Sequence, residues 1–529
     1  MDLPLLLRKS VSHFPGRPAV VYEGDTLTYA ELYERSCRLT NALTGLGLRP
    51  GDRVGVLGDN TIAAVEEICG LALAGLVRVT LYSHNPPDLQ VHALNLTGAR
   101  GLIVQPSYLE GLTDRLADVP SLEHVVVQGP ETGGALPLGR LQDEASADDP
   151  RVTIDPDAPF IIRFSAGTTG LPKGIVHTAR RWWQMGNELT LCLPPLDEDS
   201  RQLVSGPVTH ANGLGVWLQI AAGGAQVVMP RFDPGHFLAL TEQHGCTWTI
   251  LVPTMIQMVV NHPDATKRDP SSLRAVMYGG SPIAEDVLAR AQAYWGEIMY
   301  QFYGQSESMP ATILPPRYHA PDETGARPKL RSAGRPTPNS HIRILDEERR
   351  DLPAGEVGEI AIRSPGAMEA LWGDPEATAE RLTADGYVLT RDLGYLDDDG
   401  FLFVADRKED MIISGGYNIW PAEVENALFA HPAVAEAAVI GVPHDKFGET
   451  PKAFVVLRPD AAVTEAELIA WCREQIGPVK KPTAVEFLTE PLPKSGVGKV
   501  LRRALKLREA ERRAHAGANQ VGSEKEQSR

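Results

Sequence analysis

Apolar runs alternate with helical patterns along the chain from Ala19 to about Tyr303. Runs such as Arg53–Leu57, Gly101–Val104 and His124–Val127 have the nearly continuous apolar character of strands in a parallel sheet. Amphipathic segments lie between such runs, and the first is opened by a capping box, Thr28 with Glu31. This alternation predicts βαβ units and layered sheets covered by helices.

The pattern changes in the last third of the chain. Between Pro310 and Phe403 prolines and glycines multiply between short strands, which predicts a small antiparallel or barrel-like element. Helices and strands alternate again from about Asp410, as in a small α+β module. We therefore expect an α/β fold with a large N-terminal domain over residues 1–408, a small C-terminal domain over residues 409–511 and a disordered tail over residues 512–529.

Charge and cysteine content narrow the class of protein. The 529 residues include 51 Lys and Arg against 68 Asp and Glu, a formal net charge of −17, which argues against nucleic acid or an anionic membrane as a main partner. The longest apolar run, Ile68–Val77, has about half the length of a membrane span and predicts a buried helix passing into a strand. The five cysteines form no CxxC pair, so we expect reduced thiols and a cytoplasmic protein.

The loop Ser165–Gly174, SAGTTGLPKG, follows the predicted strand Pro159–Phe164. Its glycines let backbone N–H groups approach an anion, its hydroxyls add donors, and Lys173 adds a positive charge. This composition favours polyphosphate binding, although taken alone it also fits a surface turn. It is not a Walker A loop, because Gly174 follows the lysine where that motif needs Ser or Thr.

Six further segments combine polar residues with glycine, and their order along the chain is informative. They are Pro207–Gly213, Met277–Ile283, Gln301–Glu307, Tyr387–Gly394, Asp406–Glu425 and Leu492–Arg502. Taken singly, each has an ordinary reading: His210 as a core histidine, for example, or Asp392 as a turn residue. In this order and spacing they resemble the core motifs of the adenylate-forming superfamily, which includes acyl-CoA synthetases, adenylation domains and firefly luciferase. The resemblance runs from about Leu27 to Arg503.

The resemblance implies ATP, Mg²⁺ and CoA as cofactors, and a mobile small domain. It implies ATP or AMP contacts for Ser165, Thr168, Thr169, Lys173, Gly279, Gly280, Ser281, Gln301, Tyr303, Ser306, Asp392, Arg407 and Lys499. It implies catalytic roles for Lys499, Ser306, Glu307 and His210, with Glu307 also as the Mg²⁺ ligand. It further implies a hinge at Glu409, a CoA channel at Gly415 and Gly416, and an acyl pocket at His210, Gly279 and Met309.

Four positions depart from the usual motifs of the superfamily. Ala166 replaces a hydroxyl residue of the phosphate loop, and Ser306 replaces Thr but keeps the hydroxyl. Arg391 stands where Gly is usual, and we expect its side chain to crowd the edge of the nucleotide site or to change the charge there. Glu409 stands where Asp or Lys is more common, and we expect the longer acid still to act as the pivot.

The expected reaction is activation of a medium-chain, aryl or alicyclic carboxylic acid by ATP to an acyl-adenylate with release of pyrophosphate, then transfer of the acyl group to CoA with release of AMP. Segment Pro207–Gly213 lacks an acid for an α-amine, which argues against an amino acid substrate. One alternative is delivery to an acyl carrier protein, and another is a luciferase-like oxygenase. One observation argues against a non-catalytic nucleotide-binding regulator, namely the joint retention of Lys173, Glu307, Asp392, Arg407 and Lys499. A homodimer is compatible with the resemblance.

Overall fold

The structure is a computed structural model of the chain. It describes residues 3–164, 171–281, 283–320, 327, 329–407, 410–415, 417–444, 446–494 and 500–513, with the backbone alone at 406, 407 and 418. The chain divides into two compact units. Unit 1 comprises residues 1–343, 361–390 and 398–402, and unit 2 comprises residues 344–360, 391–397 and 403–529.

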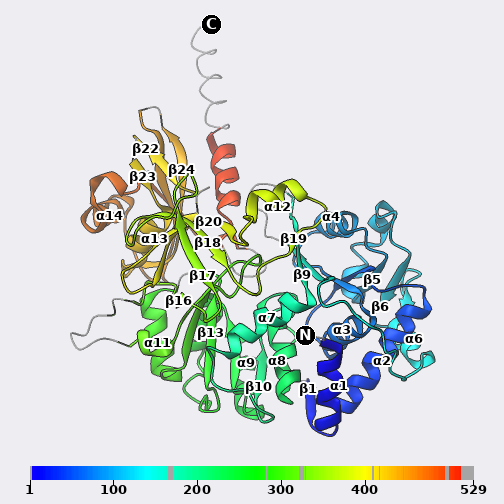
Figure 1. Cartoon of the computed structure of the whole chain (residues 1–529). Helices are drawn as coiled ribbons and strands as arrows, with labels where there is room; N and C mark the ends of the chain where they lie inside the picture. The colour runs from blue at the N-terminus through cyan, green and yellow to red at the C-terminus, as the bar shows by residue number, and fades with distance from the viewer. Residues whose placement is uncertain are drawn as a thin grey trace. The chain divides into compact units, whose positions relative to one another are not determined.

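The elements follow one another from the N-terminus as labelled in Figure 1. The α-helices are α1 (Leu3–His13), α2 (Tyr29–Gly45), α3 (Ile62–Ala74), α4 (Pro87–Thr97), α5 (Pro106–Leu109), α6 (Leu138–Glu144), α7 (Ala179–Thr190), α8 (Leu214–Ala222), α9 (Pro234–His244), α10 (Pro253–Val260), α11 (Glu285–Trp295), α12 (Pro375–Arg381), α13 (Pro421–Phe429) and α14 (Glu465–Lys480). Short 3₁₀ turns are η1 (Thr113–Asp118), η2 (Ala211–Gly213) and η3 (Pro316–Tyr318). Residues 502–513 are also helical.

One large sheet of unit 1 has the strand order β16-β15-β14-β13-β12-β10-β11-β1-β2 within the described residues. Its strands are β1 (Pro18–Tyr22), β2 (Asp25–Thr28), β10 (Arg201–Val204), β11 (Ala225–Val228), β12 (Trp248–Leu251), β13 (Ala275–Gly279), β14 (Met299–Tyr303), β15 (Thr312–Leu314) and β16 (Arg335–Pro336). Neighbours from β1 to β14 along this order are parallel, whereas β2, β15 and β16 pair antiparallel. The carboxyl ends of β13 and β14 therefore lie side by side.

The second large sheet of unit 1 has the order β19-β9-β8-β4-β3-β5-β6-β7 within the described residues. Its strands are β3 (Arg53–Leu57), β4 (Val77–Thr80), β5 (Gly101–Val104), β6 (His124–Val127), β7 (Leu136–Pro137), β8 (Pro159–Phe164), β9 (Gly174–Thr178) and β19 (Ala370–Leu371). Strands β8 and β9 pair antiparallel on either side of the predicted phosphate loop in the sequence.

Helices α1, α2, α3, α7 and α8 share one hydrophobic core with both large sheets. That core takes Met277 and Phe302 from the first sheet and Ile161 from the second. Helices α9, α10 and α11 cover the other face of the first sheet, where Tyr278 is buried. The expected helix-covered sheets are confirmed, and so is the capping box, since the Thr28 hydroxyl accepts from Glu31 N and the Glu31 carboxylate accepts from Thr28 N.

The predicted small element is a four-stranded sheet ordered β17-β18-β20-β21. Its strands are β17 (His341–Leu345), β18 (Gly358–Arg363), β20 (Val388–Leu396) and β21 (Leu402–Arg407). The division between the two units passes through these strands. The predicted boundary at residue 409 stays a prediction, because residues 408 and 409 lie outside the described part of the chain.

The C-terminal part of unit 2 is an α+β module, as expected. Its sheet has the order β23-β22-β25-β24, with β26 also pairing with β25. The strands are β22 (Ile412–Ser414), β23 (Tyr417–Ile419), β24 (Val434–His444), β25 (Gly448–Leu457) and β26 (Ala484–Leu488). Helices α13 and α14 pack on its apolar core. Of the predicted tail over residues 512–529, residues 512 and 513 continue the helix 502–513, and residues 514–529 lie outside the described residues.

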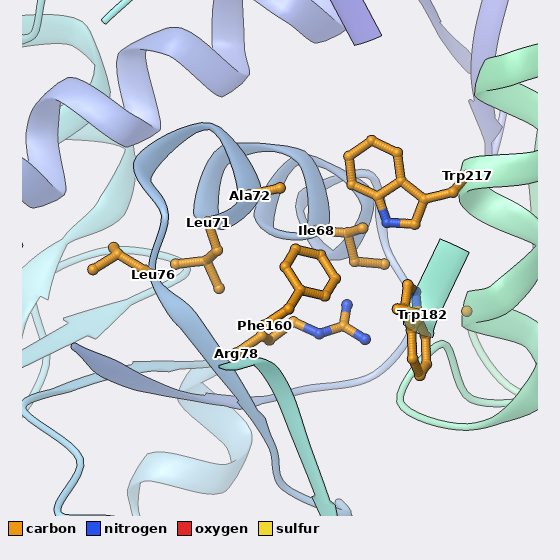
Figure 2. A pocket seen from close by; sticks show the side chains of 9 residues that line it. Ile68, Leu71, Ala72, Leu76, Arg78, Phe160, Trp182 and Trp217 are labelled. Carbon is orange, nitrogen blue, oxygen red and sulfur yellow. The ribbon is translucent and has the colours of Figure 1, made fainter. Parts of the chain in front are cut away.

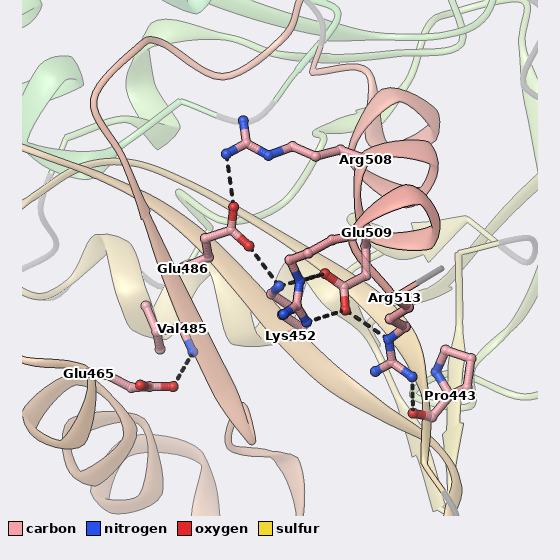
Figure 3. Close-up of polar contacts among 9 residues, drawn as sticks. Pro443, Lys452, Glu465, Val485, Glu486, Arg508, Glu509 and Arg513 are labelled. Carbon is pink, nitrogen blue, oxygen red and sulfur yellow. Dashed lines mark hydrogen bonds and ion pairs between the residues drawn. The ribbon is translucent and has the colours of Figure 1, made fainter. Parts of the chain in front are cut away.

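Helix 502–513 is held to this module by buried charges (Figure 3). Lys452 Nζ lies 2.7 Å from Glu486 Oε2 and 2.7 Å from Glu509 Oε2, with the Lys452 and Glu509 side chains 6% and 4% exposed. Arg512 and Arg513 add hydrogen bonds of 2.8 Å to the same Glu509 carboxylate. Hydrogen bonds from Arg512, and then from Lys452 and Arg513, hold the pKa of Glu509 well below its usual range.

Candidate active site

Two buried side chains, Arg163 and His177, hold the turn that follows β14. Arg163 on β8 donates from Nη2 to the Ser306 carbonyl at 2.6 Å, and His177 on β9 donates from Nε2 to the same oxygen at 2.9 Å. The Arg163 and His177 nitrogens lie 3.1 Å apart because they share this acceptor. The two large sheets are thereby joined directly beneath the predicted catalytic residues Ser306 and Glu307.

The charge state of this pair follows from its burial. Arg163 and His177 are 2% and 0% exposed, and the Arg163 guanidinium lies 5.1 Å from the centre of the Trp182 ring. Burial, reinforced by the charge of Arg163, lowers the pKa of His177 well below its ordinary value. The imidazole is therefore neutral near pH 7, and its Nε2 carries the proton donated to Ser306.

Glu307 lies in the same turn, and its side chain is largely shielded from solvent. Its Oε1 is 3.5 Å from Nη2 of Arg381 at the end of α12, and the two side chains are 10% and 15% exposed. Arg381 also donates to Gln305 Oε1 at 3.1 Å and to the Leu389 carbonyl at 2.7 Å. The backbone carbonyl of Glu307 accepts from Met368 N at 2.7 Å. The carboxylate is thus oriented from both its backbone and its side chain.

The predicted Gly-Gly turn follows β13, beside β14. A Cβ on Gly279 would lie 2.4 Å from the Phe302 carbonyl, so a side chain there would displace backbone. Gly280 has φ +85°, a left-handed conformation that glycine adopts without strain. Gln301 pairs in register with Tyr278, and Phe302 with Gly279. Ser281 follows directly, so this edge gathers four predicted nucleotide contacts: Gly279, Gly280, Ser281 and Gln301.

Gln301 and Tyr303 lie on the same face of β14, because they are two residues apart on one strand. Both are partly buried. The Tyr278 hydroxyl lies 3.2 Å from Oε1 of Gln301 and 2.8 Å from Nε2 of His319. His319 in turn approaches the Pro315 carbonyl through Nδ1 at 3.1 Å. A chain of polar groups therefore ends at Gln301, one of the predicted nucleotide contacts.

His210 immediately precedes the 3₁₀ turn η2, which leads into α8. Its ring lies 4.2 Å from the ring of Tyr82, centre to centre. The Tyr82 hydroxyl donates at 3.0 Å to the carbonyl of Phe164, the last residue of β8. The predicted acyl-pocket histidine is thus one side chain away from the start of the predicted phosphate loop. Met309 is buried in the core that also holds Phe302.

Lys173 lies near the end of the predicted phosphate loop, at an exposed position. Its Nζ is 3.0 Å from Asp374 Oδ2, and the two side chains are 51% and 41% exposed. Asp374 also caps α12 by accepting from Ala377 N at 2.9 Å. This capping bond, and then the Lys173 ammonium, lower the pKa of Asp374 below its ordinary value. The lysine is accordingly held at the N-terminus of α12, where solvent weakens the ion pair.

Asp392 and Gly415 belong to unit 2. Asp392 lies on β20 and is 7% exposed. Arg391 before it has φ +62°, the left-handed region, which gives a physical reason why glycine suits this position. Gly415 has φ +58°, and its N–H donates to the Phe447 carbonyl at 2.9 Å. Of Arg407 the structure describes the backbone, at the end of β21.

Several predicted residues lie outside the described part of the chain. They are Ser165, Ala166, Thr168, Thr169, Glu409, Gly416 and Lys499. Their roles stay predictions. Among the described residues, no group of three or more His, Cys, Asp or Glu side chains could hold a metal ion. A single carboxylate such as Glu307 nevertheless fits Mg²⁺ bound with a nucleotide, since this ion takes one or two carboxylates and completes its shell with phosphates and water.

A small pocket lies between α3, β4, β8, α7 and α8 (Figure 2). It has room for about one water molecule. Figure 2 shows the Arg78 guanidinium among apolar and aromatic side chains, including Trp182 and Trp217. Its one hydrogen bond to the described residues runs from Nη2 to the Val208 carbonyl at 3.5 Å. Trp217 on α8 lines this space beside α3.

Comparison with known proteins decides the family. Residues 7–372 match the AMP-binding enzyme family, and residues 423–499 match the AMP-binding enzyme C-terminal domain.

The chain belongs to the AMP-binding enzymes.

Relatives of this AMP-binding enzyme extend over nearly its whole length. A feruloyl-CoA synthase from Amycolatopsis sp is 38% identical over 499 residues, covering 92% of this chain and 95% of that protein. The fatty acid–[acyl-carrier-protein] ligase ScoC from Streptomyces coeruleorubidus is 35% identical, covering 93% and 94%. The amide bond synthetase McbA from Marinactinospora thermotolerans has the same fold, with a TM-score of 0.86, 29% identity and coverage of 96% and 99%. The expected adenylate-forming superfamily and its two-part α/β fold are confirmed.

Sequence reasoning about this AMP-binding enzyme missed Arg163, His177 and Arg381. A signal for Arg163 exists, because an arginine inside the apolar strand Pro159–Phe164 requires a buried acceptor. His177 and Arg381 carry weaker signals, since histidine is often partly buried and Arg381, next to Glu380, resembles an exposed helix residue. None of the helices in the described parts of the chain combines the length and apolar character needed to cross a membrane.

Proposed function

We propose that this AMP-binding enzyme is an acid–thiol ligase that makes an acyl-adenylate from a carboxylic acid and ATP, and then an acyl-CoA. The observation that carries the proposal is the turn Ser306–Glu307, which is fixed by Arg163, His177 and Arg381 beside the Gly279–Gly280 edge. A rigid turn next to a glycine edge suits a reaction in which two anions must meet in one orientation.

In the first step a substrate carboxylate oxygen attacks the α-phosphorus of ATP, and the bond from that phosphorus to the bridging oxygen of pyrophosphate breaks. Glu307 would hold Mg²⁺, which offsets phosphate charge when bound. Ser306 would donate its hydroxyl to the α-phosphate or to the acyl carboxylate. Lys173, with Thr168 and Thr169, would hold the departing pyrophosphate, and Lys499 would neutralise charge at the reacting centre.

The adenine and the ribose of the nucleotide would be held by different residues. Tyr303 would stack on the adenine, with Gln301 at its edge and the bare backbone of Gly279 and Gly280 against its face. The Asp392 carboxylate would accept hydrogen bonds from both ribose hydroxyls, with Arg407 beside it.

In the second step the thiol sulfur of CoA attacks the acyl carbon, AMP leaves, and the thiol proton goes to solvent. A thiol needs the space that Lys499 would occupy during adenylation, so one fixed arrangement serves both steps poorly. We propose rotation of the small domain about Glu409, which withdraws Lys499 and presents Gly415 and Gly416 to the pantetheine arm.

The acceptor and the acid are to be assigned by experiment. The 38% identity to a feruloyl-CoA synthase supports CoA as acceptor and an aryl acid as substrate. The 35% identity to an acyl-carrier-protein ligase supports a fatty acid passed to a carrier thiol as the second candidate. His210 and Met309 would line the acyl group in either case.

The deciding experiment measures pyrophosphate release with ATP and Mg²⁺ over hydroxycinnamic, benzoic, fatty and alicyclic acids. Each acid is run with and without CoA, and products are identified by mass. Release with an acyl-CoA product supports the proposal and names the substrate class. Release that leaves acyl-adenylate in the presence of CoA favours a carrier protein. No release with any acid would contradict the proposed reaction.

A further inference from the structure

The Tyr278 hydroxyl stands between His319 and Gln301, at 2.8 Å from Nε2 of the first and 3.2 Å from the side-chain amide of the second. Tyr278 and His319 are both fully buried, whereas Gln301 is partly exposed. The two buried side chains therefore lie behind a partly exposed glutamine. The direction of each hydrogen bond follows from where His319 carries its proton.

His319 fixes the direction of the chain. Its Nδ1 lies 3.1 Å from the Pro315 carbonyl, which can only accept, so Nδ1 carries a proton. Burial lowers the pKa of His319 to about 4, so the ring is neutral near pH 7 and holds one proton. Nε2 is therefore an acceptor, and the hydrogen bond at 2.8 Å is donated by the Tyr278 hydroxyl.

The proton of a hydroxyl cannot be donated twice. Once it is given to His319, the Tyr278 oxygen can only accept from Gln301, so the glutamine must present its NH₂ group to Tyr278. The oxygen and nitrogen of a carboxamide are assigned from such networks. The Gln301 carbonyl oxygen is then turned away from Tyr278, and that end of the amide makes no hydrogen bond to the described part of the chain.

We propose that Tyr278 and His319 are positioning residues that aim the Gln301 carbonyl oxygen at the nucleotide base, and so favour a base with a 6-amino group over one with a 6-oxo group. This rests on the proposed function, in which Gln301 and Tyr303 hold the base. Two observations support it: Gln301 shares a strand face with Tyr303, and it is the register neighbour of the strand that ends at Gly279. An acceptor there pairs with adenine and opposes the 6-oxygen of hypoxanthine or guanine.

The test compares ATP with ITP, which differ at the 6-position of the base. The variant is Tyr278→Phe, which keeps the ring and removes the hydroxyl, so the Gln301 amide can turn over. We expect the ratio of kcat/KM for ATP to kcat/KM for ITP to fall about tenfold, the value of roughly one hydrogen bond. This ratio does not depend on how much of the sample is folded, so a merely structural role would leave it unchanged.

The matched control is Tyr300→Phe, which removes a hydroxyl from the residue before Gln301, on the opposite strand face. It should keep the wild-type ratio. An unchanged ratio in Tyr278→Phe, or an equal fall in both variants, overturns the proposal. Should Tyr278→Phe fold too poorly to assay, His319→Phe is measured for the same ratio, and a retained ratio overturns it equally.

Direct binding separates this inference from the proposed function. ATP and ITP affinities are measured by calorimetry on the wild-type protein and on Gln301→Leu. ATP binding that Gln301→Leu weakens more than ITP binding supports the assignment of Gln301 as a base contact. Absence of ATP binding to the wild type would contradict the proposed function itself. ATP binding with no change of preference in any variant would contradict the positioning role alone.

Discussion

The ammonium of Lys452 and the carboxylate of Glu509 meet at 2.7 Å in a place that solvent hardly reaches. Glu509 lies on helix 502–513, and Lys452 lies on β25 (Figure 3). We expect Glu509→Ala to destabilise unit 2 by about 1–3 kcal/mol, because the buried Lys452 ammonium would lose one of its two carboxylate partners and keep only Glu486. The measurement is urea unfolding. Glu511→Ala, an exposed position two residues on, is the control and should change stability by less than about 0.5 kcal/mol. Equal effects would contradict the role of burial.

Arg163 should matter for catalysis through the position of the turn it holds. Arg163→Lys keeps the charge but loses the planar fork that reaches the Ser306 carbonyl. We expect acid-dependent pyrophosphate release to fall about tenfold to a hundredfold, the effect of misplacing a reacting group by about 1 Å. Arg180→Lys, whose side chain pairs with Asp157 on the surface, is the control. Wild-type rates in Arg163→Lys would show that the turn holds its shape without this bond.

Lys499 should act in one half-reaction only. We expect Lys499→Ala to slow adenylation by about a thousandfold, since a charge at the reacting phosphate is lost. Transfer to CoA from supplied acyl-adenylate should stay within about threefold of wild type, because the lysine has left by then. Single-turnover assays of each step give the answer. Glu409→Pro should show the reverse pattern, and equal losses in both steps would count against the proposed rotation.

A substitution at Gly279 tests how closely β13 approaches β14. We expect Gly279→Ala to cost about 1–3 kcal/mol of stability and most of the adenylation activity, because the new methyl would press on the Phe302 carbonyl 2.4 Å away. Gly139→Ala on α6 is the matched control, since its Cβ would point into open space and alanine favours a helix. Thermal unfolding and pyrophosphate release are measured on both. A Gly279→Ala protein of wild-type stability would contradict the predicted clash.

His319 should contribute to the pH dependence of stability. Burial lowers its pKa to about 4 in the folded chain, against an ordinary value of 6.5. The unfolded state therefore binds more protons between these values, and the contribution to stability that is present above pH 6.5 is lost as the pH falls toward 4. We expect His319→Gln to reduce this loss by up to about 3 kcal/mol, measured by urea unfolding at pH 4.5 and 7. Identical pH slopes would contradict the assignment.

Much of the fold could be predicted because its strands are buried on both faces. Arg53–Leu57, Gly101–Val104 and His124–Val127 stand in the structure with the predicted bounds, since turn residues bracket each apolar run. Ile68–Val77 does pass from α3 into β4.

The contacts that hold the turn at Ser306 could not be predicted in the same way. Arg163 and Ser306 are 143 positions apart, and His177 and Ser306 are 129 apart, so no local pattern joins them. They meet because two different sheets bring them to one turn. The departure at Arg391 was visible, yet its left-handed backbone was not, since φ at a single residue depends on the strand that holds it.

Arg163 and His177 both bind the main chain of residue 306 and leave its side chain alone. These two contacts therefore do not depend on the side chain at that position. Threonine has the same main chain as serine, so we expect Ser306→Thr to leave the neighbouring Glu307 carboxylate in place. The two residues that hold this part of the motif, Arg163 and His177, lie outside the motif itself.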